Sequence, residues 1–144
     1  MKIDKTDLDI IACLKRNGRS SNNEIAAKLS ISEGTVRNRI RKMTDSGYLN
    51  VKGLVNPGKI KEKQVVFLGA KVEVSKDLER TAEAVSKLPQ VNSTSIVTGR
   101  FDLLIEIFLE PYDIINFLST DLASLNSVVS TETFMTLKNY NKWV

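Results

Sequence analysis

The sequence predicts an α+β protein, with a helical N-terminal part followed by an antiparallel β-sheet that carries two helices on one face. Two observations lead to this prediction. Up to Tyr48 the apolar residues recur every three or four positions, as on helices, and from Gln64 they alternate as on strands. Between these regions, Asn56-Pro57-Gly58 is a strong turn signal. Together they indicate two domains separated by a short connecting segment.

The net charge of +4 is concentrated in the N-terminal part. Residues 1–62 carry 13 Lys and Arg against 7 Asp and Glu, a net charge of +6, whereas residues 63–144 have a net charge of −2. A localised basic excess is typical of a protein in which one module contacts nucleic-acid phosphates and the other does not. We therefore expect domains at 1–54 and 64–144, joined by a linker at 55–63.

The composition limits the chemistry that the chain supports. It has a single cysteine, Cys13, and no histidine, which excludes an internal disulfide and a zinc site of the His/Cys type. Cys13 lies in an apolar helical pattern, which favours a buried side chain. The sequence has no Gly-rich nucleotide-binding turn, no apolar run of membrane-spanning length and no signal peptide. We expect a cytoplasmic protein that is not an enzyme, binds no cofactor and has no membrane partner.

The N-terminal domain is expected to contain three helices. The first spans Asp4–Arg16, and the second spans Asn22–Leu29 with Ser21 or Asn22 as its N-cap. The third begins after Ser32, a favourable N-cap, and ends at Gly47, where a left-handed residue is expected. Apolar residues at helical spacing form the predicted core: Leu8, Ile11, Ile25, Leu29, Ile31, Val36, Ile40 and Met43.

The third helix carries the functional prediction. Only Ser30-Ile31-Ser32 separates it from the second helix, which is the spacing of a helix-turn-helix. Its face opposite the Val36, Ile40 and Met43 stripe is basic, and guanidinium and amide groups pair bidentately with base edges in the major groove of DNA. A solvated surface helix is the alternative, but it does not explain the short turn.

We therefore predict that this helix binds double-stranded DNA. The candidate contact residues lie on the helix or at its N-cap: Ser32, Gly34, Thr35, Arg37, Asn38, Arg39, Arg41 and Lys42. Asn38 and Arg41 lie almost opposite the apolar stripe, so they are expected to point deepest into the groove. Arg39 lies at the flank, where it would reach a phosphate or brace the fold.

Alternating apolar and polar residues at Tyr48–Val55 indicate a strand directly after the third helix. It would serve either as the wing of a winged helix-turn-helix domain or as a hinge strand that leads to the second domain.

The C-terminal domain is expected to have the order βαββαβ. The predicted strands are Gln64–Val74, Val91–Thr98, Leu103–Leu109 and Val128 to about Leu137, and the predicted helices are Asp77–Leu88 and Tyr112–Leu125. This order produces an antiparallel sheet with both helices on one side, as in ferredoxin-like folds. The helices are expected to bury Leu78, Ala82, Val85, Ile115, Leu118, Leu122 and Leu125.

The predicted sheet has a second apolar face, which two helices on the other side do not cover. Phe67, Leu104, Phe108 and Phe134 lie on it. An exposed apolar area of this kind usually marks a partner, and a symmetric dimer suits palindromic DNA. We therefore expect a homodimer. The alternative is that the linker or the C-terminal segment Tyr140–Val144 folds over this face.

An ordered set of short motifs runs through the whole chain: Asp7-Leu8-Asp9-Ile10-Ile11, Glu24-Ile25-Ala26, Leu29-Ser30-Ile31-Ser32, Thr35-Val36, Arg39-Ile40-Arg41-Lys42-Met43, Gly47-Tyr48-Leu49, Asn56-Pro57 and Gly99-Arg100-Phe101-Asp102. In this order they resemble the leucine-responsive/asparagine-synthetase regulator family, Lrp/AsnC. Met43 stands where the family usually has Leu, and Tyr48 where a small aliphatic residue is usual. Neither departure affects the expected fold.

The resemblance implies a nucleoid-associated transcription regulator whose C-terminal domains, of the ACT or RAM type, dimerise, often form octamers and often bind an amino-acid effector. In this family the loop between the second and third strands of that domain lines the effector pocket, and it matches Gly99, Arg100 and Asp102 here. A Gly amide can approach a carboxylate closely, and an Asp can accept a hydrogen bond from an ammonium group. The alternative is that both are turn formers, with Asp102 bonded to its own hairpin.

A function of another class is a ligand-sensing regulatory subunit that docks on a metabolic enzyme and does not bind DNA. The sheet domain would then act on the enzyme, and the N-terminal helices would be its docking element. The basic charge of the N-terminal part argues against this alternative.

Overall fold

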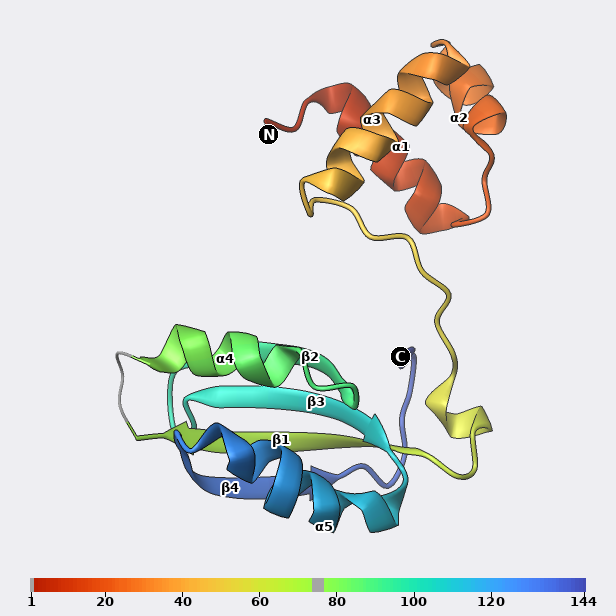
Figure 1. Ribbon diagram of the computed structural model, residues 1–144. Coiled ribbons are helices and arrows are strands. Elements are labelled where there is room, and N and C mark those ends of the chain that lie inside the picture. Colours follow the sequence, from red (N-terminus) through yellow and green to blue (C-terminus); the bar gives the residue numbers. More distant parts are fainter. Residues whose placement is uncertain (1, 74–76) are drawn as a thin grey trace. The chain divides into compact units, whose positions relative to one another are not determined.

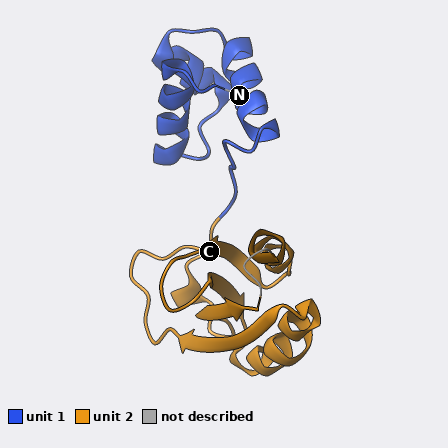
Figure 2. Ribbon diagram, turned by 90° about the vertical axis from the view of Figure 1, so that its left-hand side faces the viewer, with its two compact units in different colours: residues 1–53 blue, residues 54–144 orange. Residues whose placement is uncertain are grey.

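The structure is a computed structural model that describes residues 2–73 and 77–144 (Figure 1). The chain divides into two compact units, residues 1–53 and 54–144, each with its own hydrophobic core (Figure 2). A 3₁₀ turn, η1 (Pro57–Lys59), lies near the start of the second unit and is capped by Asn56. None of the helices in the described ranges combines the length and the apolar character needed to cross a lipid bilayer.

The first unit consists of three helices: α1 (Lys5–Arg16), α2 (Asn22–Leu29) and α3 (Glu33–Asp45). The three-helix prediction is confirmed, and local side-chain caps explain where each helix begins. Asp4 caps α1 in a reciprocal capping box with Asp7, and Ser21 caps α2 in the same way with Glu24. Ser32 accepts a hydrogen bond from the backbone N–H of the third residue of α3. The Ser32 cap therefore fixes where the short turn after α2 ends and α3 begins.

The end of α3 is a Schellman motif. Gly47 has the left-handed backbone that the sequence predicts, with a φ of 73°. The backbone N–H of Tyr48 donates to the carbonyl of Met43 at 2.8 Å, and that of Gly47 donates to Thr44 at 3.0 Å. These bonds satisfy carbonyl groups of the last turn and direct the chain away from the helix.

The core of the first unit excludes one predicted residue, Leu8, and includes Ile10, which the predicted list lacks. Its buried apolar residues are Ile10, Cys13, Ile25, Ala26, Val36 and Met43. Leu8, predicted as a core residue, is 58% exposed, so that prediction is wrong. The physical reason is the rotation of α1: Asp7 is buried toward α3, which leaves the next residue, Leu8, on the outside.

The predicted strand at Tyr48–Val55 is also wrong. Tyr48 still belongs to the capping motif of α3, and the described residues that follow it form no β-ladder. Val55 alone exchanges two backbone hydrogen bonds, of 2.8 and 3.0 Å, with Val144 in the second unit. An extended segment becomes a strand only where a neighbour pairs with its N–H and C=O groups, and apolar alternation does not supply that neighbour. The described residues therefore contain no wing hairpin.

The second unit has the predicted βαββαβ order. Its elements are β1 (Gln64–Val72), α4 (Leu78–Ser86), β2 (Val91–Ile96), β3 (Leu103–Leu109), the 3₁₀ turn η3 (Pro111–Asp113), α5 (Ile114–Asn116), which continues as the π-helical η4 (Phe117–Leu122) and the 3₁₀ turn η5 (Ala123–Leu125), and β4 (Val128–Met135). The antiparallel strands have the order β2-β3-β1-β4, and both helical segments cover one face (Figure 1). Val74, predicted as the last inward residue of the first strand, lies outside the described residues.

The core lies between the sheet and its helices. In the register of β1 and β3, Leu68 pairs with Ile105, and both side chains are fully buried on the inner face. Val85 of α4 packs against them, as predicted. In the other helical segment Phe117 is buried, whereas Ile115, predicted to be inward, is 73% exposed. The prediction for Ile115 is wrong because the larger Phe117 and its neighbours define the buried stripe.

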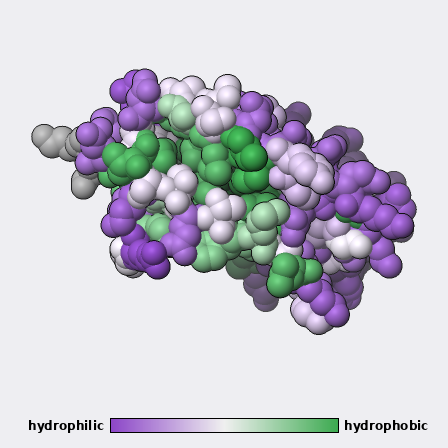
Figure 3. Space-filling model, turned by 90° about the horizontal axis from the view of Figure 1, so that it is seen from below, coloured by the Kyte–Doolittle hydropathy of each residue, from purple (hydrophilic) through white to green (hydrophobic). Residues whose placement is uncertain are grey.

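The outer face of the sheet is partly covered by the C-terminal segment. Lys142 forms an ion pair with Glu106 of β3 at 2.5 Å and lies over the ring of Phe67. Leu104 and Phe134 remain 40% and 45% exposed on this face. The segment therefore covers part of the apolar surface and leaves another part open. Separately, the side of the second unit on which β4 and α5 lie lowest in Figure 1 shows hydrophobic residues gathered in an area framed by polar ones (Figure 3).

Candidate DNA-recognition helix and effector loop

The outer face of α3 presents a group of polar and basic side chains. Arg37, Asn38, Arg41 and Lys42 are exposed along it. At the start of the helix, the hydroxyl groups of Ser32 and Thr35 lie 2.8 Å apart, and the Ser32 hydroxyl also accepts from the backbone N–H of Thr35 at 3.1 Å. Gly34, in the same first turn, is partly buried.

The exposed side chains on this face have only weak local partners. Arg37 pairs with Glu33 one turn away at 3.2 Å, and Arg41 donates to the amide oxygen of Asn38 at 3.4 Å. Exposed pairs at this helical spacing contribute about 0.3–0.5 kcal/mol, so a ligand replaces them at little cost. The groups are therefore available to base edges and phosphates.

Arg39 differs from the other basic residues of α3 because it is turned toward α1. Its guanidinium donates to a carboxylate oxygen of Asp7 at 2.8 Å and to one of Asp4 at 2.7 Å. The Asp7 side chain is 3% exposed and that of Arg39 is 31% exposed. Both carboxylates belong to the capping box of α1, so Arg39 connects α3 to the first turn of α1.

These contacts shift the pKa values of Arg39 and Asp4. Hydrogen bonds to the carboxylates raise the pKa of Arg39 above its ordinary value, and the bond to Asp7 has a larger effect than the bond to Asp4. The pKa of Asp4 is lowered, first by the hydrogen bond that its carboxylate accepts from the Asp7 backbone and then by Arg39. The charged forms of Arg39 and Asp4 are therefore favoured.

A shallow hollow runs beside this pair. It is lined by residues from the N-terminus, α1 and α3: Lys2, Asp4, Asp7, Thr35, Asn38, Arg39 and Lys42. Lys2 lies close to the candidate DNA-binding residues in space but far from them in the sequence. The sequence analysis missed it, because a single N-terminal lysine has no pattern that points to α3.

The loop between β2 and β3 holds the candidate effector residues. Gly99 has a φ of 116°, a conformation that favours glycine. Arg100 extends from the loop to form an ion pair with Glu132 of β4 at 2.9 Å. The carboxylate of Asp102 accepts a hydrogen bond from the backbone N–H of Val72 at 2.9 Å, so its side chain is bonded to β1 and not to its own hairpin.

Phe101, between these candidates, is a structural residue that the sequence analysis did not single out. Its ring lies against Gly69 of β1 and meets the ring of Phe134 edge to face, with centroids 6.3 Å apart. Glycine within a strand is the signal that would have indicated it, because such a glycine often marks a close approach. Phe101 therefore anchors the loop on the outer face of the sheet.

Gly69→Ala is expected to displace this anchor. The new Cβ would lie 2.5 Å from a ring carbon of Phe101, and overpacking of this kind costs about 1–3 kcal/mol. Urea unfolding followed by the fluorescence of Trp143, the single tryptophan, measures the loss in the second unit. The same substitution made in a Phe101→Ala background should cost less, since the clash is gone. An equal cost in both backgrounds would exclude Phe101 as the cause.

The residues that the structure describes contain no group of three or more His, Cys, Asp or Glu side chains placed to hold a metal ion. The site residues are instead hydrogen-bonding and charged groups on α3 and on the β2–β3 loop. The chemistry that they support is recognition of polar ligands.

Comparison with known proteins agrees with both halves of the structure. A model described as winged helix-turn-helix DNA-binding matches residues 3–50, and one described as Lrp/AsnC ligand binding domain matches residues 65–142. An HTH-type transcriptional regulator of Pyrococcus furiosus is 32% identical over 143 residues, which cover 98% of this chain and 95% of the relative.

Two solved structures show the same fold over nearly the whole chain. A transcriptional regulator of Neisseria meningitidis, solved in complex with L-Met, has a TM-score of 0.74 and 26% identity, covering 98% of this chain and 94% of that one. The leucine response regulatory protein of Mycobacterium tuberculosis has a TM-score of 0.83 at 16% identity, covering 97% and 96%. With the family model that matches more than half of the sequence, these findings show that the chain belongs to the Lrp/AsnC family of transcription regulators.

Proposed function

We propose that this DNA-binding regulator reads its operator with the outer face of α3, in the cytoplasm at the nucleoid. Asn38 and Arg41 contact base edges in the major groove, and Arg37 and Lys42 contact phosphates beside them. The observation that carries this assignment is the division of the basic residues of α3. Four polar groups face outward, whereas Arg39 is held by Asp4 and Asp7.

A gel-shift titration against the protein's own promoter at several salt concentrations tests this function. Lys and Arg contacts with phosphates release counterions, so the logarithm of the affinity should fall linearly with the logarithm of the salt concentration. Absence of binding at low salt would instead favour the alternative, a regulatory subunit that docks on an enzyme.

The same proposal includes a homodimer, from which larger assemblies such as octamers are built. Leu104 and Phe134 support it, because they leave apolar area open on the outer face of the sheet. A two-fold symmetric dimer places two copies of α3 on two half-sites of DNA.

In sedimentation velocity at micromolar concentration, the full-length protein is expected to behave as a dimer or a larger species. Leu104→Glu should shift it toward the monomer, because association would bury an unpaired charge. Tyr112→Glu is the matched control, since that residue is 92% exposed on η3. Equal effects of the two substitutions, or a wild-type monomer, would refute this interface.

We assign amino-acid sensing to the loop that carries Gly99, Arg100 and Asp102. The fold supports this assignment, because the relative solved with L-Met has the same architecture. A Cβ added at Gly99 would meet no atom within 4 Å, so the space beside this residue is open, and Asp102 is held at the end of β1.

Asp102→Asn is expected to lower the thermal stabilisation that the effector of this loop produces in a screen of the twenty amino acids. The amide oxygen of Asn still accepts from Val72, so the fold is kept, while the charge that attracts an ammonium group is lost. Binding to DNA without effector should be unchanged. If the variant keeps the whole of the ligand-induced shift, Asp102 serves only to hold β1.

A further inference from the structure

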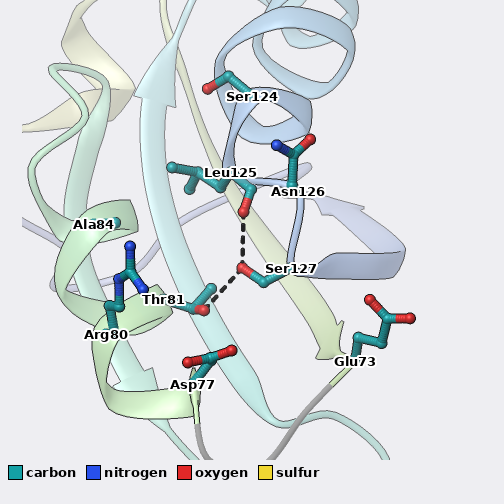
Figure 4. A pocket seen from close by; sticks show the side chains of 9 residues that line it. All are labelled: Glu73, Asp77, Arg80, Thr81, Ala84, Ser124, Leu125, Asn126 and Ser127. Carbon is teal, nitrogen blue, oxygen red and sulfur yellow. Dashed lines mark hydrogen bonds between the residues drawn. The ribbon is translucent and has the colours of Figure 1, made fainter.

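A cavity in the second unit lies apart from the residues assigned above. It opens between α4 and the connection from η5 to β4, and its volume is about 480 Å³ (Figure 4). Cavities that bind small molecules typically measure about 300–1,000 Å³. The size is therefore sufficient for a metabolite.

The charged groups around this cavity have both signs. The carboxylates of Glu73 and Asp77 and the guanidinium of Arg80 surround it in Figure 4. In residues 2–73 and 77–144, none of these three side chains takes part in an ion pair within the protein. They are available to a ligand that has an ammonium group at one end and a carboxylate at the other.

The inner wall of the cavity is fixed by hydrogen bonds. The hydroxyl groups of Thr81 and Ser127 lie 2.9 Å apart, and Ser127 also donates to the carbonyl of Leu125 at 2.9 Å. Thr81 is only 3% exposed, so this polar contact joins α4 to the start of β4 below the surface. Asn126 has a left-handed backbone, with a φ of 50°, in the connection that forms the opposite wall. Hydrogen bonds thus join α4 to the connection from η5 to β4 on this side of the cavity.

We propose that this cavity binds a free amino acid, at a site separate from the β2–β3 loop. Its ammonium group lies between Glu73 and Asp77, and its carboxylate pairs with Arg80. A purely anionic ligand would meet two carboxylates, and a purely cationic one would meet Arg80, so the arrangement selects a zwitterion. Apolar contacts with Leu125 and Ala84 accommodate the side chain of the ligand.

The end of β1 connects this cavity to the effector loop. The backbone N–H of Val72 donates to Asp102 in the loop, and the N–H of the next residue, Glu73, donates to the carbonyl of Ser127 in the cavity wall at 2.9 Å. Two successive residues therefore contact the two sites. A ligand that shifts this strand end changes the affinity of the other site, and the coupling acts in both directions.

Isothermal titration calorimetry of the full-length protein with each of the twenty amino acids tests the proposal. At least one amino acid should bind to the Asp102→Asn variant, in which the effector loop is impaired, and Arg80→Gln or Asp77→Asn added to this variant should each weaken that binding at least tenfold. Glu79→Gln is the matched control, because Glu79 is an exposed carboxylate of α4 that does not line the cavity. Acetate, which is only negatively charged, and putrescine, which is only positively charged, should bind at least tenfold more weakly than the amino acid.

Asp102→Asn separates this cavity from the effector loop. Binding in the cavity should survive that substitution, and gel shifts without ligand should be unchanged in Arg80→Gln. The proposal is overturned if no amino acid binds, if Glu79→Gln weakens binding as much as Arg80→Gln, or if binding is lost in Asp102→Asn and retained in Arg80→Gln. Loss of DNA binding by wild type would contradict the proposed function and not this site.

Discussion

Arg39→Ala is expected to lower the free energy of unfolding of the first unit by about 2 kcal/mol. The substitution leaves Asp7, whose side chain is 3% exposed, without its cationic partner. Breaking a fully buried ion pair costs about 3–5 kcal/mol and an exposed pair less than about 1 kcal/mol, and this pair is intermediate because Arg39 is 31% exposed. Circular dichroism at 222 nm during urea unfolding measures the loss, since the first unit is helical. The unfolding midpoint followed by the fluorescence of Trp143, which lies in the second unit, should be the same in wild type and Arg39→Ala.

Arg37→Ala is the matched control for this prediction. It removes an arginine from the same helix, but from an exposed pair with Glu33, so its cost should stay below about 0.5 kcal/mol. If Arg37→Ala and Arg39→Ala are equally destabilising, the contacts with Asp4 and Asp7 do not brace the unit.

The stabilisation by Arg39 should also depend on pH. The pKa of Asp4 in the folded state is lowered from its ordinary value of 3.8, so its ion pair contributes fully above pH 3.8 and is lost as the pH falls through the folded-state value. The difference in unfolding free energy between wild type and Arg39→Ala should therefore narrow below pH 3.8. A constant difference down to lower pH would argue against a role for the Asp4 carboxylate.

Asn38→Ala and Arg41→Ala are each expected to cost about 1–3 kcal/mol of binding to the preferred operator, which is roughly a 5- to 150-fold loss of affinity. Both side chains point away from the buried Val36 and Met43, so they reach farthest into a groove that α3 occupies. Fluorescence anisotropy with specific and non-specific duplexes measures the loss, which should be confined to the specific one.

Lys42→Ala provides the comparison for a phosphate contact. It should weaken specific and non-specific binding alike and lower the slope of affinity against salt by about one. If Lys42→Ala removes the preference for the operator and Arg41→Ala does not, α3 is rotated relative to the proposed docking.

The helices of the first unit were predictable because their signals are local. Ser21, Ser32 and Gly47 stand at helix ends, and each has in the structure the role that its chemistry indicates. The contact of Arg39 with Asp4 and Asp7 joins residues 35 and 32 positions apart, and no local pattern encodes it. The burial of Asp7, and with it the exposure of Leu8, follows from that distant partner.

The second unit was likewise predictable only where the signals are local in the sequence. Its strand order follows from the βαββαβ pattern, and Leu103–Leu109 is the third strand as predicted. The strand expected at Tyr48–Val55 failed because periodicity does not show whether a neighbour is present. The partner of Asp102 on β1 and the cavity around Arg80 depend on which segments the fold brings together, so only the structure reveals them.

Selection of binding sites from a random library of double-stranded DNA tests the central claim most directly. Wild type, Asn38→Ala, Arg41→Ala and Arg39→Ala are each carried through the same selection at one salt concentration. Wild type should enrich a two-fold symmetric sequence, Asn38→Ala and Arg41→Ala should each relax one base position in both half-sites, and Arg39→Ala should recover the wild-type sequence with fewer bound molecules. Two results would contradict recognition by the outer face of α3. In the first, wild type enriches no sequence. In the second, the selected sequence changes with Arg39→Ala but not with Asn38→Ala or Arg41→Ala.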